Sequence, residues 1–426
     1  MTTVALRDKP THPPGLYVLF FTEAWERYSF YSLLSVLVLY MDESLRFSAD
    51  TIGQVYGGYI AAVYFIPMLG GFIADRFLGY NKTVIVGGVL ITIGHFVLAT
   101  ETLSTFYIAL GLIASGAGLL KPNISTMVGN LYRDQPQLKD AAYNIFYMGI
   151  NIGGFLGPLG VAYFRANYGW SVALGSAGVA MAVALVIFVM FNKLIAHAGH
   201  RPAAANNPIA EPDPPDAKER IVALSVTFAV CTVFWFAFYQ NGYSMTLWAR
   251  DSTDTTWSPE VFYASNGLFI ILLTPPLVRL WSYLRSQNRE PATPTKLLIG
   301  MWITVACFGL MALAGLAGGD TGKVSPAWLL GAYVLLSLAE ICLSPMGLSL
   351  VARMAPQKVR GVMMGVWFLT LSGGGYFAGY LGSEYANMPH SRFFLLVAGL
   401  AAVAAVVLML LLRQFKSIFA RSLAHS

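Results

Sequence analysis

Residues 16–41 read LYVLFFTEAWERYSFYSLLSVLVLYM, an apolar run that Glu23, Glu26 and Arg27 interrupt near its start. A helix needs about 20 mostly apolar residues to cross a bilayer. This run is long enough, and its three charges are unusual because each costs roughly 2.5–3.5 kcal/mol at the centre of a membrane helix. The run therefore predicts a membrane helix that turns one face toward a polar interior.

The composition of the whole chain agrees with this class. Of its 426 residues, 56% are hydrophobic and only 11% are charged, and the mean hydropathy is +0.61. So little charge excludes a disordered protein, a secreted disulfide scaffold and a soluble enzyme. The expected class is an all-α polytopic membrane protein. Twelve spans are predicted, at 16–41, 51–74, 83–100, 104–128, 141–163, 171–192, 221–246, 259–284, 296–316, 325–352, 361–383 and 391–413.

One long polar segment divides the predicted spans into two sets of six. Residues 193–220 contain five prolines and mixed charges, which is typical of a flexible linker. The expected organisation is therefore two six-helix bundles joined by this linker. Its parts are a tail at 1–15, a bundle at 16–192, the linker at 193–220, a bundle at 221–413 and a tail at 414–426.

Lysine and arginine placement predicts the orientation. Twenty of these residues fall in the tails, the linker and the loops on their side, and five fall in the opposite loops. The positive-inside rule then puts both termini and the linker in the cytoplasm, with the chain in the plasma membrane, which is the inner membrane in a bacterium. No basic cluster interleaved with aromatic residues suggests a nucleic-acid partner.

Five charged residues fall inside the predicted spans: Glu23, Glu26, Arg27, Lys121 and Glu340. On a helix, Glu23 and Arg27 are one turn apart on one face, with Glu26 about 60° to the side. Two carboxylates beside one guanidinium need not both be ionised, so the cluster is a candidate proton acceptor. The alternative is a static network that holds the first helix to its neighbours. Because three acids face two bases, one proton would neutralise the set.

The charges also divide between the halves. Arg27 and Lys121 belong to the first half, and Glu340 belongs to the second. A cavity that is positive on one wall and negative on the other suits a zwitterion whose ends are well separated, such as a dipeptide or tripeptide. Further candidates are asparagines that could bond peptide amides and aromatic residues that could line side-chain pockets, although membrane aromatics often only pack. They are Asn151, Asn266, Tyr31, Tyr64 and Trp367.

Several motifs resemble one known family, the proton-coupled oligopeptide transporters of the major facilitator superfamily. Residues 23–31, EAWERYSFY, resemble its E-x-x-E-R-F/Y-x-Y-Y signature. Residues 70–79 are similar to the superfamily's motif in the loop between helices 2 and 3. Residues 146–153 resemble the family's helix 5 motif, and Phe234 with Trp235 resembles its helix 7 motif. Lys121, Glu340 and Trp367 also stand where the family has them.

This resemblance implies a fold and a role for each candidate. The fold is twelve transmembrane helices in two six-helix halves. Glu23, Glu26 and Arg27 would couple protons to transport. Arg27 and Lys121 would receive the peptide carboxylate, and Glu340 its amine. Peptide contacts would come from Tyr31, Tyr64, Asn151, Asn266 and Trp367, and gating from Asp75, Arg76, Lys121 and Glu340.

The chain departs from the family pattern at several positions. Phe30 stands where the signature has tyrosine, and Ser32 where it has glycine. Many members carry an arginine at the position of Leu34 and a glutamate at that of Tyr239, which pair as an outer gate. Both charges are absent here, so the sequence leaves open what closes the outer side.

The function that these observations predict is proton-coupled import of di- and tripeptides by alternating access, without a cofactor or a metal. The alternative is a related transporter of another small organic or inorganic anion, against which Glu340 argues. An intramembrane enzyme is disfavoured because no nucleophile with an adjacent base accompanies the charged set. The expected partners are small peptides, protons and the lipid bilayer.

Overall fold

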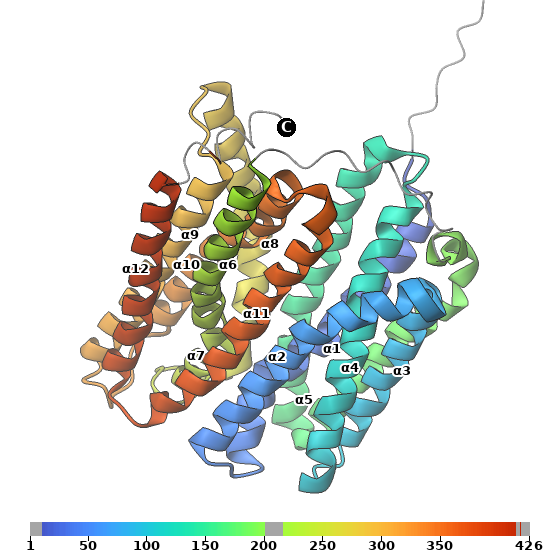
Figure 1. Cartoon of the computed structure of the whole chain (residues 1–426). Helices are drawn as coiled ribbons and strands as arrows, with labels where there is room; N and C mark the ends of the chain where they lie inside the picture. Colours follow the sequence, from blue (N-terminus) through green and yellow to red (C-terminus); the bar gives the residue numbers. More distant parts are fainter. Residues whose placement is uncertain (1–10, 201–215, 415–417, 419–426) are drawn as a thin grey trace, which may run out of the picture.

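The computed structural model describes residues 11–200, 216–414 and 418, and within them the protein is built from helices (Figure 1). A first group contains α1 (Gly15–Glu43), α2 (Ala49–Ile73), α3 (Tyr80–Leu98), α4 (Leu103–Leu131) and α5 (Lys139–Met190). A second group contains α6 (Ala217–Phe238), α7 (Ser244–Asp251), α8 (Pro259–Ser286), α9 (Thr293–Ala317), α10 (Pro326–Met354), α11 (Arg360–Gly382) and α12 (His390–Gln414). A helix satisfies its own backbone polar groups, which a bilayer cannot do.

The longest helix, α5, is two helices in succession. Gly169 has φ 82° and ψ −176° in its middle, a conformation that an L side chain would strain. The chain turns there between residues 139–168 and residues 170–190. This break separates the spans predicted at 141–163 and 171–192.

The span predicted at 221–246 is one membrane crossing with a break in it. A 3₁₀ turn, η5 (Tyr239–Gly242), separates α6 from α7. In that turn the Gln240 amide donates to the carbonyl of Ala378 on α11, 3.1 Å away. Counting α6 to α7 as one crossing and α5 as two, the described residues form twelve crossings. Nine stretches of the described helices are both long and apolar enough to cross a membrane, with α5 counted once and α1 and α11 outside the nine.

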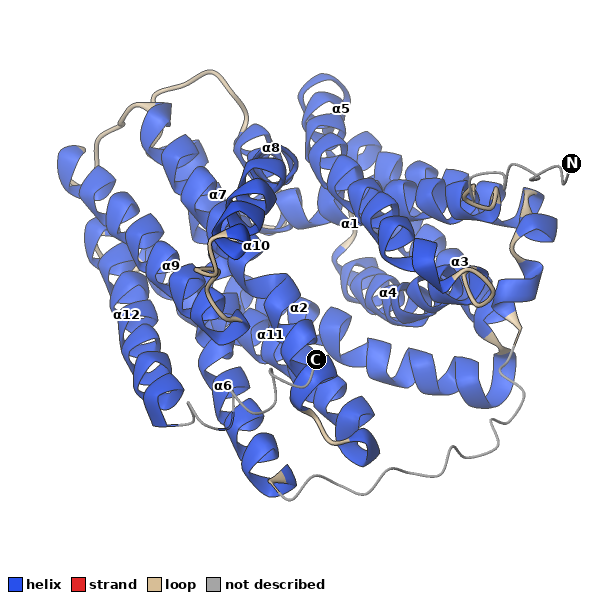
Figure 2. Cartoon of the chain, turned by 90° about the horizontal axis from the view of Figure 1, so that it is seen from above, coloured by secondary structure: helices blue, strands red, loops and turns tan. Residues whose placement is uncertain are grey.

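The two helix groups lie side by side and meet along two seams (Figures 1 and 2). At one seam α2 packs against α11, and at the other α5 packs against α8. Within the first group α1 packs most extensively on α5, and within the second α9 packs on α10 and α12. The arrangement puts α1, α4 and α10, which carry the charged candidates, and α8, which carries Asn266, around the space between the groups.

The molecule has two ends, a linker end and a distal end. At the linker end, α5 ends and α6 begins; at the distal end, α1 leads into α2 and α11 into α12 (Figure 1). The predicted linker at 193–220 is ordered at both ends, since residues 192–199 form short 3₁₀ helices and α6 begins at Ala217. Ile195 and Ala198 are buried there. The linker's middle, residues 201–215, and most of both predicted tails lie outside the described residues.

The segment expected to be a loop after α2 is helical. Residues 74–78 form a π-helical turn, η1 (Ala74–Leu78), that continues α2. Gly79 then takes φ 75° and ψ 161°, and α3 begins at Tyr80. Glycine accepts this positive φ without strain. The change of direction therefore happens at one residue rather than over a loop.

Candidate functional site

The charged residues of α1 form one compact cluster. The Arg27 Nε lies 3.1 Å from Glu23 Oε1, one helical turn away. Arg27 Nη2 also donates to Glu26 Oε1 at 2.8 Å, and Nε contacts the other oxygen of Glu26. All three residues are buried, with 1%, 1% and 2% of their surface exposed. Charges this deep are stable only because they are paired.

The two carboxylates of the cluster are not equivalent. Glu26 has both oxygens on Arg27, whereas Glu23 has its contact through Oε1. Among the described residues, the Oε2 atoms of both glutamates are buried without a hydrogen-bond partner, but that of Glu26 lies in ion-pair contact with Arg27 Nε, whereas that of Glu23 has no such contact. A buried carboxylate oxygen without a partner is costly, and a proton on it removes that cost. Glu23 is thus the member whose geometry best accommodates a proton.

Lys121 on α4 stands beside this cluster. Its Nζ lies 4.4 Å from the centre of the Tyr64 ring of α2, in a cation–π contact. Its charge also interacts with Arg27, Glu26 and Glu23. Pro122 follows it inside α4, where a proline removes one backbone hydrogen bond and allows a bend. Lys121 is partly exposed, so it presents a positive charge that a ligand can reach.

Glu340 stands on α10, in the other helix group. Its Oε2 accepts a hydrogen bond of 3.2 Å from the Asn266 amide of α8, and Asn266 also donates to Ser337 Oγ at 3.1 Å. Across the gap, its charge interacts with Tyr31 of α1 and Tyr147 of α5. The positive and negative walls therefore come from different groups, as the sequence predicts.

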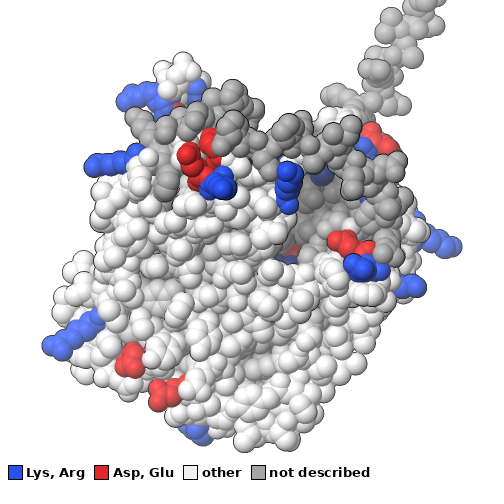
Figure 3. All heavy atoms as spheres, viewed as in Figure 1, with Lys and Arg blue, Asp and Glu red and all other residues white. Residues whose placement is uncertain are grey.

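The surface is hollowed between the two groups toward the linker end, with charged atoms visible in the hollow (Figure 3). Tyr147 is 54% exposed and interacts electrostatically with Glu340, Glu23 and Arg27. Tyr31, Lys121 and Glu340 are partly exposed. The site is thus open toward the linker end, with the α1 cluster at a deeper level.

Several predicted contacts are engaged within the protein in this conformation. The Asn151 amide donates to the carbonyl of Tyr147 in its own helix at 3.0 Å. Trp367 is 2% exposed, with its ring against Trp235 and Phe228. Among the described residues, no salt bridge joins Lys121 to Glu340. The gating and peptide roles of these residues stay predictions.

The predicted gating residues Asp75 and Arg76 lie in η1 at the linker end, and both are exposed. Asp75 Oδ1 accepts a hydrogen bond of 2.8 Å from the Tyr80 hydroxyl of α3. In the part of the chain that the structure describes, no group of three His, Cys, Asp or Glu side chains is arranged to hold a metal ion.

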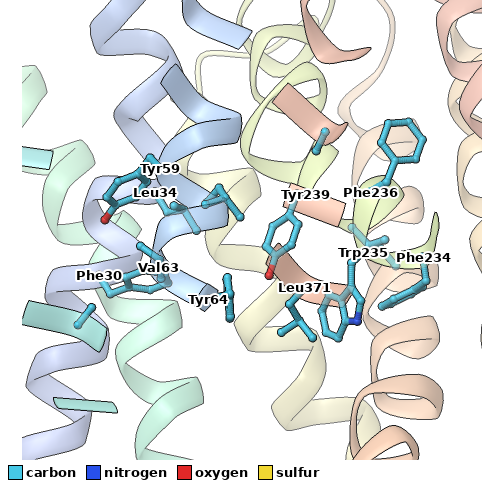
Figure 4. Close-up of a cluster of buried hydrophobic side chains, with 14 of the residues drawn as sticks. Phe30, Leu34, Tyr59, Val63, Tyr64, Phe234, Trp235, Phe236, Tyr239 and Leu371 are labelled. Carbon is cyan, nitrogen blue, oxygen red and sulfur yellow. The ribbon is translucent and has the colours of Figure 1, made fainter. Parts of the chain in front are cut away.

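The positions of the absent outer gate form a neutral layer between the groups. Leu34 is buried on α1, and Tyr239 lies opposite in η5. The rings of Tyr239 and Tyr64 meet across the gap with centres 5.8 Å apart (Figure 4). The Tyr56 hydroxyl donates to the carbonyl of Tyr239 at 2.9 Å. Aromatic packing and a neutral hydrogen bond thus occupy this level.

Sequence reasoning missed two kinds of residue. Tyr147 lies in the quoted helix 5 motif, and Ser337 is one turn from Glu340, so both positions had a signal in the chain. The second kind is the pair of arginines Arg165 and Arg250, which form ion pairs at the distal end. The sequence indicates these ion pairs only weakly. Both arginines lie close to predicted helix ends, where a charge is ordinarily solvated.

Comparisons with known proteins cover nearly the whole chain. A model described as PTR2, POT family, matches residues 81–210 and 190–395. The peptide transporter YePEPT of Yersinia enterocolitica subsp. palearctica is 32% identical over 94% of both chains. The di-/tripeptide transporter of Lactococcus lactis subsp. cremoris is 29% identical over 94% of this chain and 95% of its own. A crystal structure of a peptide transporter POT with sulfate matches at a TM-score of 0.88, with 29% identity over 96% of both chains. The expected fold class and the resemblance are confirmed.

Proposed function

The chain belongs to the POT family of proton-coupled oligopeptide transporters, and from that premise we propose that it imports di- and tripeptides together with protons. Curated relatives are named as peptide and di-/tripeptide transporters. It is a multi-pass membrane transporter and not an enzyme. The observation that carries the substrate class is the division of charge between the halves: Arg27 and Lys121 belong to the first helix group, and Glu340 belongs to the second.

The linker end faces the cytoplasm in this proposal. The excess of lysine and arginine in the linker and in the loops at that end supports this orientation, since such residues stay on the cytoplasmic side. The structure would then be open to the cytoplasm and closed at the distal, outer end. This is the state from which a transporter releases peptide or rebinds it.

The peptide termini bind to opposite walls. Glu340, oriented by the Asn266 amide, receives the α-amine. Lys121 receives the carboxylate first, because it is partly exposed and, among the described residues, forms no salt bridge, its ammonium lying over the Tyr64 ring. Tyr31 and Tyr147, which interact electrostatically with Glu340, would contact the rest of the peptide together with Asn151. A free amino acid spans less distance, since each residue extends a chain by at most about 3.3–3.6 Å.

The proton acts through the α1 cluster. A proton on Glu23 removes one of the two negative charges that hold Arg27. Arg27 then keeps its two contacts with Glu26 and gains net positive charge toward the carboxylate at Lys121. Peptide and proton thus favour each other's binding, which is the basis of symport. When Glu23 loses the proton, Arg27 returns to it and the peptide is released.

Closure of the linker end would bring Lys121 and Glu340 together once the peptide has left. These two charges attract, and pairing them neutralises the empty site. The exposed Asp75 and Arg76 of η1 lie on the same end and would contact the second group in that state.

A panel of solutes tests this function. In proteoliposomes with an inward proton gradient, labelled dialanine uptake should be reduced by unlabelled dipeptides and tripeptides, much less by amino acids, and not by nitrate. An uncoupler should abolish accumulation. Competition by nitrate or by simple carboxylates equal to that of dipeptides would favour the alternative, a transporter of another small anion.

A further inference from the structure

Charged side chains from both helix groups meet at the distal end. Arg165 lies near the end of the first helix of α5, and Glu260 lies in the first turn of α8. Arg165 Nε is 2.7 Å from Glu260 Oε1, and Nη2 donates to Oε2 at 3.2 Å. This two-point contact of a guanidinium with a carboxylate is the strongest ion-pair geometry available to side chains.

A second contact lies beside it. Arg250 of α7 has Nη1 at 2.6 Å from Asp42 Oδ2 and at 3.4 Å from Glu43 Oε1, both on the last turn of α1. Glu43 Oε2 is also 3.1 Å from Arg165 Nη1. Glu43 therefore joins the two arginines, and the five residues form one connected set, here called the distal ion-pair cluster.

Burial makes this cluster sensitive to separation. The Glu260 side chain is 0% exposed and that of Arg165 is 20% exposed. A buried carboxylate is tolerated when its cation is in contact, and both groups regain water when the halves part. The cross-group contacts therefore exist in the distal-closed form and are replaced by water when the halves part.

Each arginine keeps a partner when the halves separate. Arg165 retains Glu43, which belongs to its own helix group. Arg250 retains Asp251 of its own group, with contacts of 2.7 Å and 3.0 Å. Opening then exchanges cross-group partners for water without leaving an arginine alone. Contacts built in this way can break and re-form at every cycle.

The neutral layer below adds hydrogen bonds but no charge. The Tyr243 hydroxyl donates to the carbonyl of Ala49 at 3.2 Å, and Tyr56 donates to Tyr239 as described above. At Leu34 and Tyr239 the side chains are buried and uncharged (Figure 4). Ionic closure in this chain therefore lies farther out, at the ends of α1, α5, α7 and α8.

We propose that the distal ion-pair cluster is the outer gate of this transporter. Arg165, Glu260, Arg250, Asp42 and Glu43 hold the halves together while the peptide site is open at the linker end, and their cross-group contacts break when the site opens outward. The inference rests on the proposed function, because a gate is needed only if the protein alternates between a state open at the linker end and a state open at the distal end. None of the five residues belongs to the peptide site.

Distances between spin labels on the full-length protein in liposomes test this gate. One pair, at Asn167→Cys and Thr256→Cys, reports on the distal end; a second, at Asp134→Cys and Gln287→Cys, reports on the linker end. These four positions are exposed, and the native Cys231, Cys307 and Cys342 are buried. Both pairs are measured without peptide, so the readout does not depend on transport.

Glu260→Gln should lengthen the distal distance and shorten the linker-end distance, raising the distal-open population about tenfold or more, because the substitution removes a buried charge pair. Asp42→Asn, at the solvated rim, should shift both distances in the same directions by a smaller factor. The matched control is Asp320→Asn inside the second group. Ser391 donates to the two Asp320 oxygens at 2.6 Å and 2.8 Å, and the substitution removes the charge and one of these acceptors, so it should change neither distance.

Unchanged distributions in both Glu260→Gln and Asp42→Asn would overturn the gate, as would an equal shift in Asp320→Asn. If Glu260→Gln fails to fold, Asp42→Asn alone decides. The proposed function fails separately, through absence of peptide uptake by the unaltered protein, and that result leaves the distance measurements intact.

Discussion

Glu340 is held by an amide rather than by an ionic partner. Asn266 donates to one of its oxygens, and Ser337 bonds Asn266 in turn. This arrangement orients the carboxylate and leaves it available to a cation that comes from outside. A structural ion pair would instead have a fixed basic residue at this position. This environment supports the proposed role of Glu340, the binding of the peptide's α-amine.

Glu340→Gln should weaken the binding of peptides that have a free amine and raise their KM by about 10–100-fold. This is the loss expected for one hydrogen bond to a charged group. N-acetylated peptides should lose little, because they bring no positive charge to this wall. The measurement is competition against labelled dialanine, with the surface variant Asp254→Asn as control. An equal loss for free and blocked peptides would contradict the amine role.

The two glutamates of α1 should respond differently to neutralisation. Glu23→Gln mimics the protonated state and keeps the Glu26 contacts with Arg27, so it should abolish accumulation driven by a proton gradient yet preserve peptide counterflow. Glu26→Gln removes the two-point contact and should reduce both activities. Gradient-driven uptake and counterflow, measured for both variants in the same liposomes, distinguish the two glutamates. Full gradient-driven accumulation by Glu23→Gln would exclude Glu23 as the coupling site.

Glu290, in the connection between α8 and α9, contributes a pH-dependent term to stability. Hydrogen bonds from Arg285 and Lys296 lower its pKa from 4.5 to about 2. Stabilisation from such a group is complete above about pH 4.5 and is lost as the pH falls toward 2. Glu290→Gln should lower the stability in detergent by roughly 1 kcal/mol. The difference in Tm should be equal at pH 7 and pH 5 and smaller at pH 3; a difference that grows on acidification would contradict this.

At the scale of elements, the seam between α2 and α11 depends on glycine. A Cβ built on Gly379 of α11 would lie 2.1 Å from the carbonyl oxygen of Gly53 on α2, and one on Gly53 would lie 2.5 Å from that of Gly379. Side chains cannot occupy such distances, so the backbones of the two helices touch. This contact is near the distal end, and it sets how closely the halves approach there.

Gly379→Ala should therefore oppose distal closure. We expect transport to fall several-fold, with a distal-open shift in the spin-label distances. Gly58→Ala is the matched control, because a Cβ at that position of α2 meets nothing within 4 Å. If both substitutions leave transport unchanged, the seam is not closely packed in the working protein.

At the scale of the whole molecule, the cycle is a movement of one helix group against the other. The two groups touch along the α2–α11 and α5–α8 seams, while the hollow separates them toward the linker end (Figures 2 and 3). Movement about such seams exposes the charged walls alternately to the two sides. When a neutral zwitterion is carried with one proton, each cycle moves one net positive charge across the membrane.

Uptake of a neutral dipeptide should therefore respond to membrane potential. At equal internal and external pH, an inside-negative potential of 100 mV set with valinomycin contributes about 2.3 kcal/mol per charge. That energy corresponds to up to roughly 50-fold accumulation for one proton per peptide. Accumulation that follows the pH gradient but is indifferent to potential would show that the cycle is electroneutral.

The sequence alone determined the class of protein and the charges in α1, α4 and α10, and it predicted twelve crossings in two halves. These follow from information that is local in the chain: runs of apolar residues, polar breaks between them, and charged residues inside the apolar runs. Within a helix the geometry is also local, which is why the contact of Glu23 with Arg27 could be anticipated. The motifs added the family.

Only the tertiary structure decided which groups meet. Arg165 and Glu260 are 95 residues apart in the chain, and Arg250 and Asp42 are 208 apart. A hydropathy pattern predicts that these residues lie in solvated loops, because it contains no information on which helices pack together. The same holds for the glycines of α2 and α11, for the 3₁₀ break at Tyr239–Gly242 and for the burial of Trp367. These features depend on how the two halves pack, which hydropathy along the chain does not record.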